Sequence, residues 1–472
     1  LKAAKEKVAA YFGDIPATPT MAQPEVDPAK RGTDTREVMQ DKVPATRIYR
    51  VWNVAQADSL DNDQLQLLAQ VLGGSKASRL DKRLLHDEKL VDAISAGLDS
   101  SQLGSGFIVM ATVKPGVDPA KVEAAIDEEV KKLVTAGPTA AELEQAKTVT
   151  RAGFIRGIQA DVLAECAVYT GNPGCFRESL ANMAAATPAQ IKAVGGKWLA
   201  SGSHTLVIEP GERTPLAEEP SVAPAPFKLP AVDPKYKVLA STVDRSKGVQ
   251  VPTQFPELKF PVLQRATLKN GTKVILAERH DIPVVQFSYE FKRGAATDPA
   301  GKLGLASFAM NMLDEGAGPL DSLAFANAVE SEGAVVKAGA SLDGSNVYLS
   351  ALKENLDPSL DLYADMLRAP RFDQADIDRV KATTIAGIKQ EKARPNGAAQ
   401  RVLPPLLYGA GHPYAIPMSG SGTEADVAGL SRADLAGYEQ SGLRPETATL
   451  IVAGDTTLKE IVPLLDKPFG DW

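Results

Sequence analysis

A proline-rich stretch in the middle of the chain constrains the fold more than any other feature. Ten of the prolines in the 472-residue sequence fall between positions 210 and 261. Proline has no backbone N–H and a fixed φ, so this density excludes a helix or a central strand and favours an extended chain. We interpret 211–261 as a linker. The blocks on either side, 43–210 and 262–472, are each long enough to bury a core of their own.

The overall charge limits the kinds of partner. The formal net charge is −7 and the isoelectric point is near 5.4. Without a basic excess, a nucleic-acid partner and an anionic membrane surface are both disfavoured. The sequence has no run of 18 apolar residues, so we expect no membrane span, and no signal peptide is visible. The chain begins at Leu1 within a helical pattern, so any targeting segment is expected upstream.

The two cysteines allow two interpretations. Cys166 and Cys175 are too few for a disulfide scaffold and do not form a zinc motif. They are either two small buried residues or one disulfide that closes a short loop around Asn172-Pro173-Gly174. A disulfide would indicate an oxidising compartment such as the periplasm. The compartment stays open, with a lean towards the bacterial periplasm.

Strand patterns alternate with long helical patterns in both blocks. In the first block we expect strands at 45–54, 106–115 and 204–210, and helices at 61–72, 119–135, 139–157 and 188–199. We also expect 161–184 to be helical on both sides of the Asn172-Pro173-Gly174 turn. In the second block we expect strands at 284–292, 335–340, 346–351 and 448–455, and helices at 302–316, 320–332, 356–367, 374–392, 395–407 and 431–439. Strands separated by long helices around one sheet predict α+β or α/β layers, with a sheet packed against helices.

The two ends of the sequence resemble each other. Phe12-Gly13-Asp14 aligns with Phe469-Gly470-Asp471, and Leu1-Lys2 aligns with Leu458-Lys459 in the same register. Two matches without a gap favour a long repeat. We therefore expect 1–15 to be the last helix of a preceding repeat domain. Residues 16–42 are polar and show no periodicity, so we interpret them as a connector.

The segment KLGLASFAMNMLDEG, residues 302–316, determines the functional interpretation. Its apolar residues follow helical spacing and predict one buried helix. Ser307, Met310 and Asn311 are expected on the other face. Ser307 and Asn311 lie one turn apart, the spacing at which two histidines on a helix hold zinc, with a glutamate before the second histidine as base. The segment therefore has the spacing of a metal site without its ligands.

The order of elements around this segment resembles a known family. A hairpin pattern around Asn270-Gly271, a strand at 284–292, a glycine-rich loop and the helix resemble the start of the pitrilysin/insulinase metallopeptidases. In that family the helix reads His-x-x-Glu-His and a distant Glu completes the zinc site. By position, the histidines fall on Ser307 and Asn311, the base on Met310 and the distal ligand near Gly387. The resemblance therefore implies a degenerate domain with no catalytic, cofactor-binding or metal-ligating residue.

Other segments extend this resemblance. LGGSKASRL at 72–80 is similar to the family's usual second-domain sequence, and His412-Pro413-Tyr414 matches a family loop. An Arg and a Tyr of the family's final domain fall on His86 and Ala93, so that pair is absent. The resemblance identifies 43–210 as a second peptidase-like domain and 262–472 as a third, degenerate one. It implies an α+β fold of two similar α/β sandwich domains of the metallopeptidase half-clamshell type, each with a sheet packed against long helices and joined by the proline-rich linker. For His412 we expect packing or hydrogen bonding rather than metal binding.

Three hypotheses about function follow. We favour a non-catalytic part of a zinc metallopeptidase, in which the catalytic domain and its zinc lie upstream. By resemblance, this part would contribute the wall of an enclosed chamber and bind peptide or unfolded polypeptide, with the other half of the same protein as partner. The second hypothesis is a non-catalytic homologue that acts as a structural or partner-binding subunit, and the third is an unrelated α/β binding module. None of the four histidines belongs to a zinc motif, so whether the chain itself is part of an active enzyme stays open.

Overall fold

The chain forms two compact units of very different size. The computed structural model describes residues 2–15, 26–157, 160–213 and 260–472, together with residues 246, 254 and 257. The smaller unit comprises Leu1–Val26 and Pro215–Phe260, and the larger comprises Asp27–Thr214 and Pro261–Trp472. The predicted linker over 211–261 lies almost entirely outside the described residues.

Helix α1 (Lys2–Phe12) is the described element of the smaller unit. It buries none of its residues, and Val8 and Phe12 are 58% and 61% exposed. In the register of the terminal repeat these two residues correspond to Leu465 and Phe469, which are fully buried. Both copies of the repeated segment are therefore helical, but only the second copy has its apolar face covered within the described part of the chain.

Within its described residues, the larger unit contains a five-stranded sheet, a six-stranded sheet and a separate two-stranded pair. We call residues 27–214 the first lobe and residues 261–472 the second lobe. The sheet of the first lobe has the order β1-β5-β2-β4-β3, with β1 parallel to β5 and the other pairs antiparallel. The strands are β1 (Thr35–Asp41), β2 (Arg47–Val54), β3 (Val91–Asp99), β4 (Ser105–Val113) and β5 (His204–Pro210). The helices are α2 (Leu60–Gly73), α3 (Pro119–Ala136), α4 (Ala140–Gly157), α5 (Ala160–Thr170), α6 (Cys175–Ala185) and α7 (Pro188–Trp198), with a π-helix over Asp81–Asp87.

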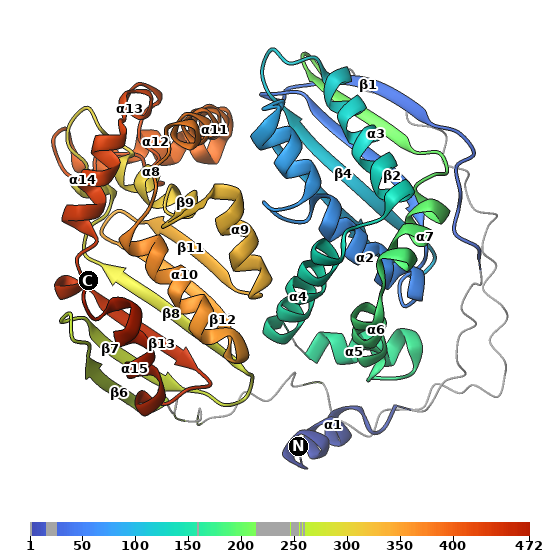
Figure 1. Ribbon diagram of the computed structural model, residues 1–472, viewed down its shortest axis with the longest axis horizontal. Helices are drawn as coiled ribbons and strands as arrows, with labels where there is room; N and C mark the ends of the chain where they lie inside the picture. Colours follow the sequence, from blue (N-terminus) through green and yellow to red (C-terminus); the bar gives the residue numbers. More distant parts are fainter. Residues whose placement is uncertain are drawn as a thin grey trace. The chain divides into compact units, whose positions relative to one another are not determined.

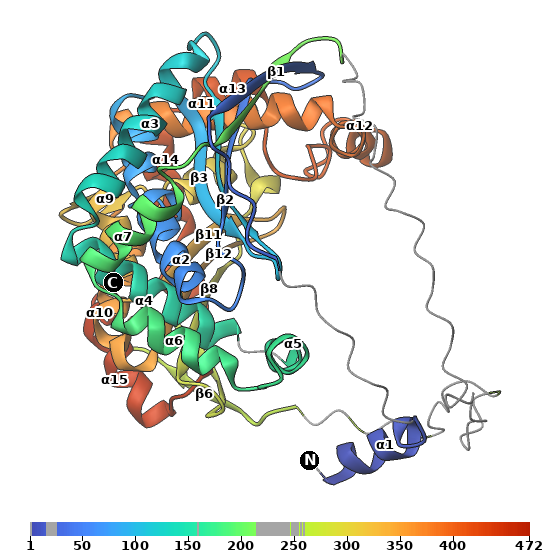
Figure 2. The same ribbon diagram turned by 90° about the vertical axis from the view of Figure 1, so that its right-hand side faces the viewer.

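Helices cover one face of this first sheet. Figure 2 shows α2, α3 and α7 on the same side of the strands. Strand β4 directs alternate side chains towards them, so Phe107, Val109 and Ala111 are buried. The ring of Phe107 meets that of Trp52 edge to face at 5.9 Å. The alternation expected for a sheet packed on one side therefore forms the core of the first lobe.

The predicted connector, 16–42, is wrong in its last part. Residues 16–25 lie outside the described residues, but Thr35–Asp41 form β1 at the edge of the sheet. Most of its side chains are exposed, so the sequence shows no apolar alternation. The strand is held by backbone pairing with β5.

The second lobe has a six-stranded sheet of order β11-β12-β8-β13-β7-β6. Its strands are β6 (Leu263–Thr267), β7 (Lys273–Glu278), β8 (Val284–Phe291), β11 (Val335–Ala340), β12 (Ser345–Leu352) and β13 (Thr449–Gly454), and β9 (Gly316–Ala317) pairs separately with β10 (Leu320–Asp321). The helices are α8 (Leu305–Asn311), α9 (Ser322–Ser331), α10 (Leu356–Arg368), α11 (Gln374–Ala393), α12 (Pro395–Tyr408), α13 (Glu424–Gly429), α14 (Arg432–Gly442) and α15 (Leu458–Phe469), with short 3-10 turns at Ala295–Thr297, Lys353–Asn355 and Pro445–Thr447.

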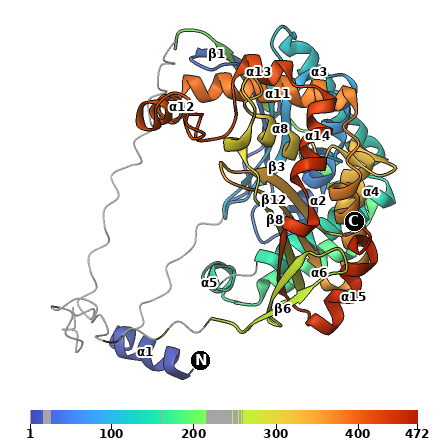
Figure 3. The ribbon, with the colours of Figure 1, turned by 90° about the vertical axis from the view of Figure 1, so that its left-hand side faces the viewer.

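Aromatic packing fixes the terminal helix on this second sheet. Tyr289 of β8 lies with its ring centroid 5.3 Å from that of Phe469 and 5.7 Å from that of Trp472. Figure 1 shows α10 and α15 side by side in front of the strands, and Figure 3 shows α11, α12 and α13 together at one end of the lobe. The predicted fold class, two sheets packed against long helices, is confirmed.

Local signals in the second lobe are also confirmed. The Asn270-Gly271 turn joins β6 to β7, and Gly271 has φ of +88°. Strands β11 and β12 pair in the antiparallel manner expected from their sequence. The helix expected over 320–332 begins later, at Ser322, because the side chain of Asp321 accepts a hydrogen bond from the backbone N–H of Ala324 and caps it.

The two cysteines form a disulfide. Cys166 in α5 bonds to Cys175 at the start of α6, with the Cα atoms 5.5 Å apart. The turn between the helices is held by Asn172, whose side-chain oxygen accepts a hydrogen bond from the backbone N–H of Gly174. The bond therefore closes one helical hairpin, the second of the two interpretations that the sequence left open.

We expect this disulfide to stabilise the α5–α6 hairpin. Reduction should lower the free energy of unfolding by about 2–4 kcal/mol, because the unfolded chain regains the freedom of the closed loop. Denaturant titrations with and without reductant measure the difference, and the Cys166→Ala/Cys175→Ala variant should not respond to reductant. Two free thiols in the unreduced, denatured chain would contradict the assignment.

Candidate functional site

Helix α8 is shorter than the sequence predicts. The expected helix over 302–316 is wrong at both ends, since α8 spans only Leu305–Asn311. Gly304 has φ of +96°, which starts the helix abruptly. Asp298 accepts hydrogen bonds from the backbone N–H groups of Gly304 at 2.8 Å and Ala306 at 3.0 Å. The last turn tightens, because the backbone N–H of Met312 lies near both Phe308 and Ala309 carbonyl oxygens.

The four positions that the resemblance assigns to the family's zinc site lie in different environments. The hydroxyl of Ser307 donates a hydrogen bond to the carbonyl oxygen of Gly420 at 3.0 Å. Met310 is completely buried, so its predicted place on a polar face with Ser307 and Asn311 is wrong. Met310 is buried because the short helix α8 packs against both β11 and α14. Gly387 lies in the interior of α11 and is exposed.

Two of these positions come together in one cavity. Asn311 and Gly387 both line a cavity of about 590 Å³, whereas Ser307 and Met310 are not among its lining residues. The cavity is also bordered by Lys76, Leu85, Asp92, Asp314, Glu315, Val336, Lys337, Ala338, Arg379, Val380, Thr383, Thr384, Ile388, Glu391 and Ser421. Its volume is in the range of small-ligand and peptide sites.

The residues at the degenerate positions do not fit zinc. Zinc sites in proteins use imidazole, thiolate and carboxylate ligands, with at least three from the protein. The four positions offer a hydroxyl that is already hydrogen-bonded, a buried thioether, a carboxamide and a hydrogen atom. Within the described ranges no group of three or more His, Cys, Asp or Glu side chains could hold a metal ion. No step of metal chemistry can therefore be derived from this chain.

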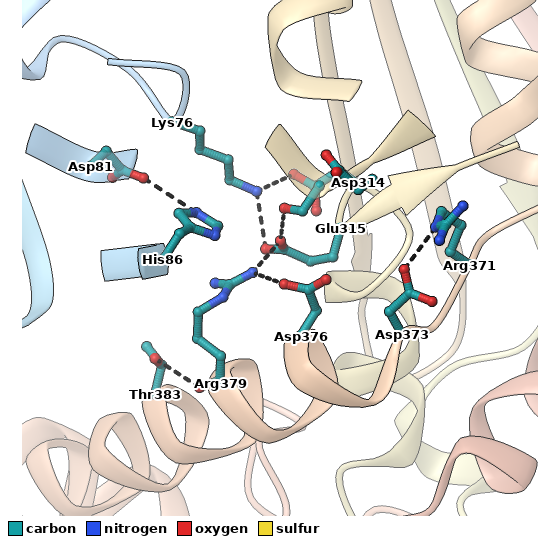
Figure 4. Close-up of polar contacts among 12 residues, drawn as sticks. Lys76, Asp81, His86, Asp314, Glu315, Arg371, Asp373, Asp376, Arg379 and Thr383 are labelled. Atoms are coloured by element: carbon teal, nitrogen blue, oxygen red, sulfur yellow. Dashed lines mark hydrogen bonds and ion pairs between the residues drawn. The ribbon is translucent and has the colours of Figure 1, made fainter. Parts of the chain in front are cut away.

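A cluster of ion pairs forms one wall of the cavity (Figure 4). Lys76 of the first lobe places its Nζ 2.8 Å from Asp314 and 3.2 Å from Glu315 of the second lobe. Glu315 also pairs with Arg379 of α11, and Arg379 contacts Asp376 at 3.0 Å. The hydroxyl of Ser322 donates to Oε2 of Glu315 at 2.6 Å, the same oxygen that Arg379 contacts, whereas Lys76 contacts Oε1. Glu315, with its side chain only 6% exposed, therefore joins three parts of the chain.

The electrostatics of this cluster favour the ionised forms of Glu315 and Lys76. Burial opposes ionisation of Glu315, but the charges of Lys76 and Arg379 outweigh it and hold the pKa of the carboxyl below its ordinary value. Burial likewise opposes the charge of Lys76, and the two carboxylates still raise the pKa of its ammonium. Both groups are therefore charged at neutral pH.

A second set of polar contacts lies beside this cluster. Glu330 of α9 accepts hydrogen bonds from the hydroxyl of Ser75 at 2.9 Å and from the side chain of Gln145 at 2.8 Å. Burial raises the pKa of the Glu330 carboxyl. Farther along α4, Arg156 donates to the hydroxyl of Ser350 at 2.9 Å. Polar contacts between the lobes therefore involve α4 and the loop after α2, and a small buried apolar cluster of Ala152, Val284 and Leu352 also joins the lobes.

The other residues singled out from the sequence have structural surroundings. His86 lies in the π-helix with its Nε2 3.4 Å from Asp81, and Ala93 is an exposed residue of β3. His412 accepts a hydrogen bond from the backbone N–H of Tyr414 at 3.1 Å and stacks on Tyr408. The expectation of packing and hydrogen bonding for His412 is confirmed.

Sequence reasoning missed the ion cluster. Lys76 and Glu315 are 239 positions apart and come from different lobes. Nothing in the local spacing of either residue indicates a partner. The one available signal was the acidic pair Asp314-Glu315, which directly follows an apolar helix pattern. A carboxylate buried at such a position would require a cation as its partner.

We expect Glu315→Gln to lower the free energy of unfolding by about 3 kcal/mol, because it leaves the buried Arg379 without its main counter-charge. Lys76 is 41% exposed, so Lys76→Met should lower the free energy of unfolding by about 1 kcal/mol or less.

The stabilisation by Glu315 should also depend on pH. Since the folded-state pKa of Glu315 is lowered, this stabilisation is complete above the ordinary pKa of 4.5 and is lost as the pH falls through the lowered pKa. Urea titrations across this pH range measure both effects, and equal losses for the two variants would contradict the assignment.

Two family models match the chain, and both belong to one peptidase family. The model of the peptidase M16 inactive domain matches residues 1–150, and the model of insulinase, peptidase family M16, matches residues 273–411. Together these ranges cover more than half of the chain. The second range contains α8 and Gly387, the parts that carry the degenerate positions.

Curated relatives match about two fifths of the chain or slightly more. A non-peptidase homologue from Helicobacter pylori is 23% identical over 194 residues, which are 41% of this chain and 44% of that protein. An uncharacterised zinc protease from Bacillus subtilis is 23% identical over 45% of this chain and 51% of its own length. Subunit 1 of the mitochondrial cytochrome b-c1 complex of Caenorhabditis elegans is 24% identical over 45% of this chain and 44% of its length. The matched part spans about half the length of these relatives.

The chain is also similar to solved structures. A peptidase M16 inactive domain from Pseudomonas fluorescens has 25% identity and a TM-score of 0.42, and covers 44% of this chain and 50% of that chain. A ferredoxin protease in complex with Arabidopsis ferredoxin has 13% identity and a TM-score of 0.45, and covers 99% and 54%. With both family models matched and the expected order of elements present, the chain belongs to the insulinase family of metallopeptidases, peptidase family M16.

Proposed function

We propose that this chain is the non-catalytic part of a zinc metallopeptidase of the M16 family, and that it contributes the wall of a chamber and binds extended peptide. The catalytic zinc would be held by a domain upstream. The chain's match to the model of the inactive domain and the misfit of Ser307, Met310, Asn311 and Gly387 to zinc support this assignment. Peptide or unfolded polypeptide would be the substrate of the whole protein.

One observation carries the peptide-binding role: an unpaired strand edge lines the cavity. Strand β11 pairs with β12 on one side, and no other strand of the described chain pairs with its other side. Its residues Val336, Lys337 and Ala338 border the same cavity as Asn311 and Gly387. A free edge offers a row of backbone donors and acceptors to which an extended peptide can add as a further strand.

The other half of the same protein is the partner that we propose for α1. Val8 and Phe12 are exposed at the positions where α15 has the buried Leu465 and Phe469. In α15 these residues cover the sheet of their own lobe. We propose that α1 covers the sheet of a preceding domain in the same way, so that 1–15 belongs to the end of that domain.

A periplasmic location is part of the proposal. The disulfide between Cys166 and Cys175 favours an oxidising compartment. In the described ranges no helix has the length and apolar character needed to cross a bilayer.

A structural or partner-binding subunit is the second candidate function. The observation in its favour is the apolar surface of α12, where Val402, Leu406 and Leu407 are 60%, 76% and 62% exposed. Exposed apolar surface of this kind is typical of a contact with another protein. The match to a cytochrome b-c1 subunit is in keeping with this role.

Site-specific photocrosslinking tests the proposed strand addition. A benzoylphenylalanine introduced at Lys337, in the middle of β11, should crosslink to fluorescein-labelled β-casein, an unfolded polypeptide. The same group at Arg265 is the matched control, because Arg265 is an exposed residue in the middle of β6, the opposite edge strand of the same sheet. We expect several-fold more crosslinked product from position 337. Equal yields at the two positions would contradict peptide binding at β11.

Metal analysis tests the non-catalytic assignment. After incubation with excess Zn²⁺ and gel filtration, we expect no stoichiometric zinc on the chain, because its degenerate positions lack imidazole and carboxylate ligands. Inductively coupled plasma mass spectrometry measures the ratio. Retention of one zinc per chain that is lost in Asn311→Ala would overturn the assignment.

A further inference from the structure

Gly387 is a glycine whose small size the chain itself does not require. It lies in the interior of α11, where glycine destabilises a helix relative to alanine. A Cβ built on Gly387 would meet no atom of the described chain within 4 Å. Neither a special backbone conformation nor close packing therefore explains the residue, and the space beside it is open.

The open space beside Gly387 connects two cavities. Gly387 lines the cavity of about 590 Å³ that contains the β11 edge. It also lines a second cavity of about 490 Å³, formed by the end of α11 and the start of α12. Glu391 borders both cavities as well. A bound peptide that leaves the first cavity would therefore pass Gly387 of α11 as it enters the second cavity.

The side chains that share a face of α11 with Gly387 form hydrogen bonds elsewhere, so they leave the glycine uncovered. Arg379, Thr383, Gly387 and Glu391 follow one another at intervals of four residues, so they share one face, and all four line the first cavity. The hydroxyl of Thr383 donates to the carbonyl oxygen of Arg379. Glu391 is held by Arg401 at 3.0 Å and by Ser421 at 2.9 Å. None of these side chains needs to lie over the glycine.

A buried donor in the same row lacks an acceptor. The Nη2 atom of Arg379 takes both ion-pair contacts, with Glu315 and Asp376. Its Nε is buried and has no hydrogen-bond partner in the described part of the chain. Buried polar atoms are nearly always hydrogen-bonded, so an unpaired one indicates an absent partner. A carbonyl oxygen of a bound molecule would supply that acceptor.

From these observations we propose that Gly387 is the crossing point at which the main chain of an extended peptide passes over α11, from the β11 edge to the second cavity. One peptide carbonyl oxygen accepts a hydrogen bond from the Nε of Arg379. The absence of a Cβ at position 387 lets the peptide backbone approach the helix closely. This inference rests on the proposed peptide binding and adds a positioning residue and a path to it.

Fluorescence anisotropy of labelled β-casein, titrated with the full 472-residue chain, tests this path. Gly387→Ala should weaken binding several-fold and raise the midpoint of thermal unfolding. Gly387→Leu should weaken binding by about tenfold or more, the loss expected when one main-chain hydrogen bond and its neighbouring contacts are prevented. A variant that binds casein more weakly but unfolds at a higher temperature has a blocked peptide path, whereas damage to the fold would lower both the affinity and the unfolding temperature.

Gly437 provides the matched control. It is an exposed glycine inside α14 of the same lobe, and a Cβ there would also meet nothing within 4 Å. Gly437→Ala and Gly437→Leu should leave binding unchanged. If the unaltered chain binds casein and Gly387→Leu binds equally well, the crossing point is wrong while the proposed function stands. If the unaltered chain does not bind casein, the proposed peptide binding fails and this inference fails with it.

Discussion

The buried carboxylate of Glu315 is the constraint on which the arrangement of the cavity depends. An ionised carboxylate with so little exposure is tolerated only when it is paired and hydrogen-bonded. Its partners come from α11, from the start of α9 and from the first lobe: Arg379, Ser322 and Lys76. Pairing Arg379 with Glu315 places α11 beside the segment that follows α8. The cavity between α11 and the edge of β11 results from this placement.

These ion pairs also hold α8 and α11 in place beside the cavity. In a zinc site the cation itself joins the ligand-bearing helices, and binding contributes to folding. In this chain α8 and α11 each line the cavity, at Asn311 and Gly387, and their positions are fixed by a buried ion pair and by apolar packing. The cations of the cluster are side chains of the chain itself. The proposal that zinc ligands are replaced at Asn311 and Gly387 is therefore compatible with a folded domain.

Regular elements could be predicted because their signals are local. The Asn270-Gly271 hairpin depends on two residues, and β11 and β12 carry alternation over a few positions. Predictions failed where tertiary structure decided the outcome. Strand β1 has mostly exposed side chains and exists through pairing with β5, and Met310 is buried because α8 packs on both sides. The cavity positions Asn311 and Gly387 were found through resemblance, whereas Lys76 and Glu315 could not be found, because pairing across lobes has no signature in sequence.

The chemistry of the cavity, together with the proposed function, favours recognition of peptide main chain over side chain. Five charged groups of its wall, Lys76, Asp314, Glu315, Arg379 and Glu391, already have ion-pair partners within the chain. Asp92 and Lys337 also line the cavity and form no ion pair within the described residues. A bound peptide would therefore meet few uncompensated charges on this wall that could select its side chains. A strand edge and a helix face interrupted by a glycine instead present backbone groups and space, which every extended peptide can use. A wall with these properties would accept peptides of varied sequence, as a chamber that holds unfolded polypeptide requires.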